Sequence, residues 1–149
     1  MTIAIVDSGF AYALIDTYDK YHEKAWELLK QPWWDFRVPA EVLVEVFHTK
    51  IQRYMQSRSY ATETFAENLL LLIEKTPFQF EPLTPSDYHL ISRLLHQYAD
   101  SGIDYVDAVV VALAERFGTR HIMTVDERDF RTYVPSFAPH FVLPLFDDV

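Results

Sequence analysis

Two short apolar segments, far apart in the chain, each end at an aspartate. Residues 3–6 read Ile-Ala-Ile-Val and are followed by Asp7, and residues 121–125 read His-Ile-Met-Thr-Val and are followed by Asp126. Continuous β-prone runs of this length are typical of strands that are buried on both faces of a parallel sheet. In open α/β sheets the ligand crevice lies beyond the carboxyl ends of the strands. We therefore expect Asp7 and Asp126 to lie at the same edge of one sheet.

Helix-like and strand-like segments alternate along the rest of the chain. Helices are expected at about 8–15, where Ser8 could cap the first turn, and at about 21–30, 40–56, 65–73, 85–95 and 103–117, with Gly118 as the last C-cap. Further short strands are expected at 36–38, 79–83 and 141–143. Strands that alternate with helices predict an α/β fold, a three-layer α/β/α sandwich with a central, mainly parallel sheet.

The length and composition exclude several classes of protein. The 149 residues fit one compact domain spanning 1–149. Cysteine is absent, which excludes disulfides and thiolate sites and favours a cytoplasmic location. The three glycines lie too far apart to build a phosphate-binding loop or a nucleophile elbow. The N-terminal apolar run ends at Asp7, too early for a signal peptide, and no run approaches the roughly 20 residues that span a bilayer, so no membrane contact is expected.

The net charge limits how this chain could handle a polyanion. Thirteen Lys and Arg residues stand against 22 Asp and Glu residues, which gives −9 at neutral pH. A chain with this balance has no general electrostatic attraction to nucleic acid. A polyanionic substrate would therefore need local basic residues or bound cations.

Further acids are predicted to join the two strand-end aspartates. Asp104 and Asp107 are spaced i and i+3 at a helix start, so they share one face, and Glu45 lies on the polar stripe of the helix expected at 40–56. Carboxylates that converge on one crevice repel each other unless cations neutralise them, and Mg²⁺ or Mn²⁺ prefers such oxygen ligands. Because such ions can activate water and stabilise charge on a phosphodiester, the pattern predicts a metal-dependent phosphodiesterase.

Each acid also has a structural interpretation. Asp7 could belong only to a turn and helix cap, Asp104 and Asp107 could be capping acids, and Asp126 with Asp129 could form a surface turn. The two glutamates of the helix at 40–56 could lie on a solvated face. Acids at two strand ends and at one helix start favour the functional interpretation when they are taken together.

Four segments occur here in the order seen in PIN domains. They are Ile5-Val6-Asp7-Ser8, Pro39-Ala40-Glu41-Val42-Leu43-Val44-Glu45-Val46, Asp104-Tyr105-Val106-Asp107-Ala108 and Thr124-Val125-Asp126-Glu127-Arg128-Asp129-Phe130. The chain resembles PIN domains over nearly its whole length, and in particular the VapC-like toxins of bacterial toxin–antitoxin pairs. The resemblance implies a ribonuclease that depends on Mg²⁺ or Mn²⁺ and acts on RNA. It also implies a homodimer that a cognate antitoxin protein inhibits.

The resemblance also implies roles for individual residues. Matched position by position, the catalytic and metal-binding acids are Asp7, Glu45, Asp107 and Asp126. Asp104 would be an additional metal ligand, and the hydroxyls of Ser8 and Thr124 would support the ligands. Glu41 is the rival of Glu45, although Glu45 better matches the distance after Pro39. Arg128 and Asp129 are expected to form an ion-paired turn that Phe130 anchors.

Two other functions are compatible with parts of the pattern. A phosphatase could use Asp7 as its nucleophile, but such sites place a second aspartate two residues later, where this chain has Gly9. A PIN fold without activity could serve as a protein-interaction module, but all four main acids are present. Lys50, Arg53 and Arg58 are candidates for contacts with phosphate or with the antitoxin, and equally for a solvated helix surface.

Overall fold

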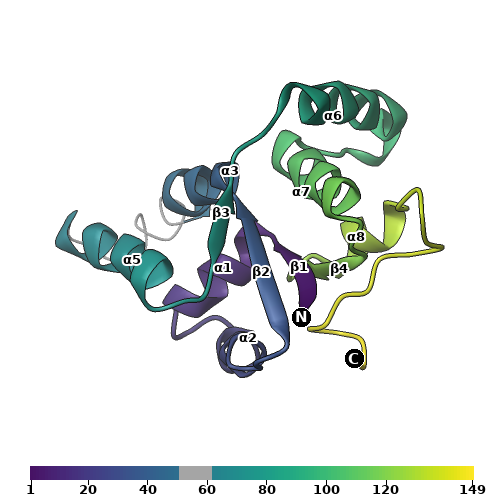
Figure 1. The fold of residues 1–149 in the computed structure, drawn as a ribbon. Helices are drawn as coiled ribbons and strands as arrows, with labels where there is room; N and C mark the ends of the chain where they lie inside the picture. The colour runs from purple at the N-terminus through teal and green to yellow at the C-terminus, as the bar shows by residue number, and fades with distance from the viewer. Residues whose placement is uncertain (51–61) are drawn as a thin grey trace.

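The computed structural model describes the backbone of residues 1–50 and 62–149. It describes the side chains of the same residues except 49, 50 and 62–65. The elements of the first half are β1 (Thr2–Val6), α1 (Ser8–Ile15), α2 (His22–Leu29), β2 (Trp34–Pro39), α3 (Ala40–Val44) and the π-helical segment η1 (Glu45–Lys50) (Figure 1). Those of the second half are α5 (Thr62–Glu74), β3 (Gln79–Glu81), α6 (Pro85–Gln97), the 3₁₀ turn η2 (Ala99–Ser101), α7 (Tyr105–Phe117), β4 (His121–Met123) and α8 (Glu127–Thr132).

The strands of the described ranges form one parallel sheet in the order β3-β2-β1-β4. Strand β1 lies between β2 and β4, with Ile5 paired to both Arg37 and Ile122 and Val6 paired to Met123. Because all the strands run in the same direction, their carboxyl ends share one edge of the sheet. The segments that follow β1, β2, β3 and β4 therefore begin at that edge.

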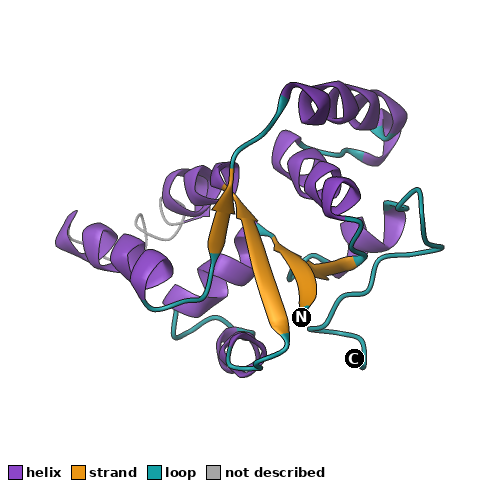
Figure 2. Ribbon diagram, viewed as in Figure 1, coloured by secondary structure: helices purple, strands orange, loops and turns teal. Residues whose placement is uncertain are grey.

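Helices cover both faces of the sheet (Figure 2). Helix α7 packs against β1 and β2, and α6 lies outside it. On the other side α1 packs with α2, α5 and η1. Residues 108–114 of α7 are almost completely buried, as expected for a helix that forms the centre of a core. The predicted three-layer α/β/α sandwich is confirmed, and its sheet is wholly parallel in the described ranges.

Several predicted boundaries are wrong. The helix expected at 40–56 changes to π-helical geometry at Glu45, and its expected end at 51–56 lies outside the described residues. Strand β4 ends at Met123 rather than at residue 125, and β3 ends at Glu81 rather than at residue 83. The strand expected at 141–143 is only an isolated bridge between His121 and Val142. The helix α8 was expected as a turn.

The helix caps also correct one expectation. Ser8 is the first residue of α1 and Asp7 occupies the N-cap position, so the prediction that Ser8 caps this helix is wrong. For α7, Asp104 is the N-cap, and its side chain accepts a hydrogen bond from the backbone N–H of Asp107. Gly118 ends α7 in the left-handed conformation, which confirms it as the C-cap. Across the described ranges, no helix has the length and apolar character needed to cross a membrane.

Gly9 allows α1 to approach the segment that follows β4. A Cβ atom at Gly9 would overlap Cγ2 of Val125. Asp7 lies two residues before Gly9, and Asp126 directly follows Val125, so the close approach brings the ends of β1 and β4 together. The absence of a side chain at this position is therefore a packing requirement of the sheet edge that carries the acids.

We expect Gly9→Ala to lower the free energy of unfolding by about 1–3 kcal/mol, because overpacking costs more than helix propensity returns. Urea unfolding of Gly9→Ala, Val125→Ala and the double variant would measure it. In the Val125→Ala background the added methyl has space, so there Gly9→Ala should be neutral or stabilising. Equal losses in both backgrounds would contradict the steric explanation.

Candidate active site

The ends of β1 and β4 are joined by one buried hydroxyl. Asp7 is 5% exposed and Thr124 is fully buried. Thr124 Oγ1 donates to Asp7 Oδ2 at 2.7 Å, and the backbone N–H of Asp126 donates to the same Oγ1 at 3.0 Å. Asp7 and Asp126 therefore lie at one edge of the sheet, as the strand ends predict, and Thr124 fixes their relative positions.

Helix α7 brings two more acids to this edge. Asp107, in its first turn, is 8% exposed, and its Oδ2 accepts a hydrogen bond of 2.8 Å from the hydroxyl of Tyr133. Tyr133 follows α8 and is fully buried. Asp104 Oδ1 accepts from the backbone N–H of Asp107 at 2.8 Å, so the capping role and the placement at the site coexist.

Within the cluster, the pKa of the Asp107 carboxyl group is strongly shifted. Burial, followed by the negative charge of Asp7, raises the pKa of Asp107 to about 8, although the hydrogen bond from Tyr133 opposes the shift. Asp104 and Asp129 add smaller repulsions. Burial and the contact with Asp107 also raise the pKa of Tyr133. At neutral pH the cluster therefore favours a proton on Asp107 unless a cation supplies the missing positive charge.

Asp129 joins the cluster, contrary to the expectation of an ion-paired turn. It lies in α8, where its backbone N–H donates to Asp126 Oδ1 at 3.1 Å, and no ion pair joins it to Arg128 within the described residues. Burial, followed by the hydrogen bond with Asp126 and the charge of Asp126, raises the pKa of Asp129. The i, i+3 spacing of Asp126 and Asp129 repeats that of Asp104 and Asp107, but the same spacing also fits an acid that only caps a helix. Phe130 is fully buried, as expected of an apolar anchor.

The two candidate glutamates line a cavity that Asp104 also lines. A cavity of about 380 Å³ is lined by Glu41, Val44, Glu45, Asp104, Tyr105 and Val106. Asp104 thus faces both the aspartate cluster and this cavity, which we call the α3–α7 cavity. Both Glu41 and Glu45 reach it, so position alone does not decide between them. Ser8 is buried at the first position of α1, directly after Asp7.

The donor set fits a hard divalent cation that keeps part of its water shell. All the converging side-chain ligands are carboxylates, and the raised pKa of Asp107 reflects first its burial and then the negative charge of Asp7. Within residues 1–50 and 62–149, no three Asp, Glu, His or Cys side chains are already spaced to hold one ion directly. Mg²⁺ is commonly held by only one or two carboxylates and several waters, and the Asp7–Asp107 pair meets that requirement.

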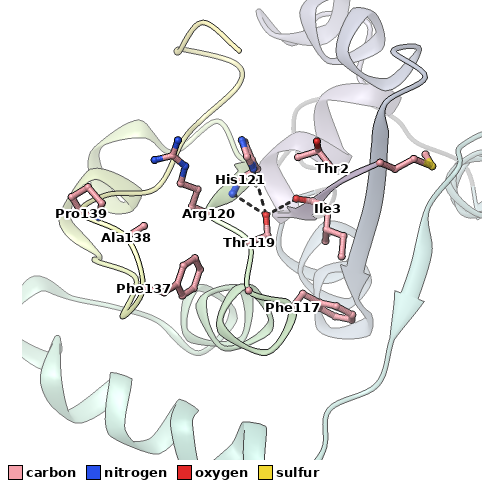
Figure 3. A pocket seen from close by; sticks show the side chains of 11 residues that line it. Thr2, Ile3, Phe117, Thr119, Arg120, His121, Phe137, Ala138 and Pro139 are labelled. Atoms are coloured by element: carbon pink, nitrogen blue, oxygen red, sulfur yellow. Dashed lines mark hydrogen bonds between the residues drawn. The ribbon is translucent and has the colours of Figure 1, made fainter.

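A larger cavity lies at the opposite edge of the sheet. It measures about 650 Å³ and is lined by residues near the start of β1, the end of α7 and the loop around Phe137 (Figure 3). There Thr119 Oγ1 donates to the backbone oxygen of Ile3, and His121 lies beside it (Figure 3). None of the sequence-predicted site residues line this cavity. The larger of these two cavities is therefore not the one beside the acids.

Comparison with known proteins identifies relatives of this fold. The model of the PIN domain family matches residues 4–134. Among solved structures, a similar one is the VapC20 toxin of Mycobacterium tuberculosis, described as cleaving the Sarcin–Ricin loop, with a TM-score of 0.67 and 18% sequence identity. The match covers 85% of this chain and 92% of that one. No curated protein matches the sequence significantly.

The raised pKa of Asp107 predicts how stability changes with pH. In the unfolded chain an aspartate ionises near pH ~4, so the metal-free protein should lose stability as the pH rises from there through about 8, where the folded group ionises. Asp107→Asn cannot ionise and keeps an acceptor for Tyr133. We expect this variant to be more stable than the wild type by about 2 kcal/mol or more at pH 8, and less so at pH 5.

Urea unfolding in the presence of a chelator, at several pH values, would measure this difference. Asp100→Asn removes an exposed carboxylate outside the cluster and serves as the control, for which we expect no comparable gain. Parallel stability curves for Asp107→Asn and the wild type across this pH range would show that Asp107 ionises normally.

Proposed function

Because the chain belongs to the PIN domain family, we propose that it is a divalent-metal-dependent endoribonuclease that acts as the toxin of a toxin–antitoxin pair. The observation that carries this proposal is the buried Asp7–Asp107 pair at the carboxyl edge of the parallel sheet, with Asp104, Asp126 and Asp129 around it. The fold shared with VapC20, a toxin described as cleaving the Sarcin–Ricin loop, supports RNA as the substrate.

In this proposal Asp7 and Asp107 hold the Mg²⁺ or Mn²⁺, and Asp126, Glu45 and Asp104 complete the site. The bound cation would supply Lewis-acid chemistry, which activates water and stabilises negative charge at phosphorus. Thr124 keeps one oxygen of Asp7 in place through its 2.7 Å hydrogen bond. Tyr133 does the same for Asp107 and restricts its carboxyl group to one orientation. Hydrolysis with departure of the 3′ oxygen would leave a 5′-phosphate on the product.

A bound cation would also reduce the repulsion between this acidic chain and the phosphates of RNA. A chain of charge −9 with a cluster of aspartates repels the phosphates of RNA. Divalent cations in that cluster would offset much of its negative charge and would give the scissile phosphate a positive centre to approach. RNA binding at the site should therefore depend on the cation as strongly as hydrolysis does.

The alternatives have less support. A phosphatase that used Asp7 as its nucleophile would need a second aspartate two residues later, where this chain has Gly9. An interaction module without activity would have no use for two buried carboxylates that repel each other, because burial and repulsion of like charges lower stability. As partners we propose RNA, a cognate antitoxin protein and a second copy of this chain.

We expect Asp7→Asn to lower the rate of RNA cleavage by about 100-fold or more, because it removes a charge that holds the cation. The measurement is cleavage of labelled RNA with Mg²⁺ or Mn²⁺, with and without a chelator, and growth of cells that express each variant. Asp100→Asn should cleave and inhibit growth like the wild type. An interaction module would instead keep its partner in the Asp7→Asn form, and wild-type activity in the presence of chelator would contradict metal dependence.

A further inference from the structure

The α3–α7 cavity has walls suited to a flat, uncharged group. Tyr105, the first residue of α7, is 44% exposed, and Val44 on α3 is 65% exposed. Both line the cavity together with Val106. Aromatic rings beside a nucleic-acid site commonly stack on unpaired bases, since every base offers a flat face. The position of Tyr105, next to Asp104 in the chain, puts such a ring at the border of the aspartate cluster.

Glu41 contributes a polar group that is short of a partner. Its Oε2 is buried and has no hydrogen-bond donor within the described part of the chain. Glu41 and Tyr105 both line the α3–α7 cavity, so a molecule bound there could contact both side chains. A buried acceptor without a donor lowers stability, and a bound molecule with N–H groups would satisfy it.

The charge of the cavity decides which part of an RNA could enter it. Among the side chains that the structure describes, Glu41, Glu45 and Asp104 line it and no basic one does. A phosphate would be repelled, whereas a base that donates hydrogen bonds would be attracted. Guanine presents two adjacent donors, N1–H and N2–H, that match the two oxygens of a carboxylate. The donors of adenine, cytosine and uracil each lie next to an acceptor, which a second carboxylate oxygen would repel.

We propose that the α3–α7 cavity binds a guanine base of single-stranded RNA, stacked on Tyr105 and hydrogen-bonded through N1–H and N2–H to Glu41, whose carboxyl group rotates on binding to present the buried Oε2. Asp104 borders both this cavity and the aspartate cluster, so the bound base belongs to a nucleotide beside the scissile phosphate. The placement next to a scissile bond rests on the proposed function, whereas the binding of guanine does not. Glu41 then selects the base, and Glu45 is left as the glutamate of the metal site.

The test uses uncharged nucleosides and the metal-free protein, so that neither cleavage nor phosphate repulsion affects the result. NMR titrations would follow the resonances of Tyr105 with guanosine, inosine and adenosine. Inosine lacks only the N2 amino group of guanosine. We expect guanosine to bind about 10-fold more tightly than inosine, which corresponds to one hydrogen bond to a charged acceptor. Equal affinities, or no shift with guanosine near its solubility limit, would overturn the proposal without any variant.

Two variants locate the discrimination. Glu41→Gln should bring the guanosine and inosine affinities close together, while Tyr105→Leu should weaken all the nucleosides alike. Glu23→Gln, at an exposed glutamate of α2, should leave the 10-fold preference unchanged. Unchanged discrimination in Glu41→Gln would overturn the assignment of Glu41. Because these measurements need no metal and no cleavage, their failure would leave the nuclease proposal intact, and loss of the nuclease proposal would leave guanine binding to be judged by itself.

Discussion

The repulsion between two buried carboxylates is the constraint on which the rest of this structure depends. Asp7 and Asp107 come from a strand end and from a helix start, and each is nearly inaccessible to water. Water therefore screens their charges poorly, and burial together with the charge of Asp7 raises the pKa of Asp107. A core would not keep such a pair for stability, because apolar residues of similar size pack at lower cost. A cation bound between the two carboxylates would offset their repulsion, which links the fold to the chemistry proposed for it.

The surroundings of the pair hold it in this unfavourable state. The parallel register places the ends of β1 and β4 side by side, and Gly9 permits the chain segments beyond them to touch. Thr124 and Tyr133 then each satisfy one carboxylate oxygen. These hydrogen bonds orient the oxygens before any cation binds, so less ordering remains for the moment of binding.

The sequence was sufficient to predict the layers of the fold and the meeting of Asp7 with Asp126, because strand ends in a parallel sheet share an edge. It was not sufficient for Asp129, since an aspartate three residues into a helix start looks the same whether it only caps the helix or also faces other acids. The contact between Tyr133 and Asp107 could not be predicted either. The two residues lie 26 positions apart, and only the packing of α8 brings the Tyr133 hydroxyl to the Asp107 carboxyl group. The short β4 was overestimated because Thr124 and Val125 are β-prone yet bend toward Asp7 and Gly9 instead of pairing.

The lone bridge between His121 and Val142 determines how the sheet can grow. Backbone hydrogen bonds run from Ile122 to Val142 and from Val142 to Arg120, so the C-terminal segment occupies the free side of β4. An uncovered strand there would offer its amide and carbonyl groups to any neighbouring polypeptide. With that side taken, two molecules that associate cannot extend the sheet across the part of β4 that Val142 covers, and β3 is the other edge strand of the described sheet.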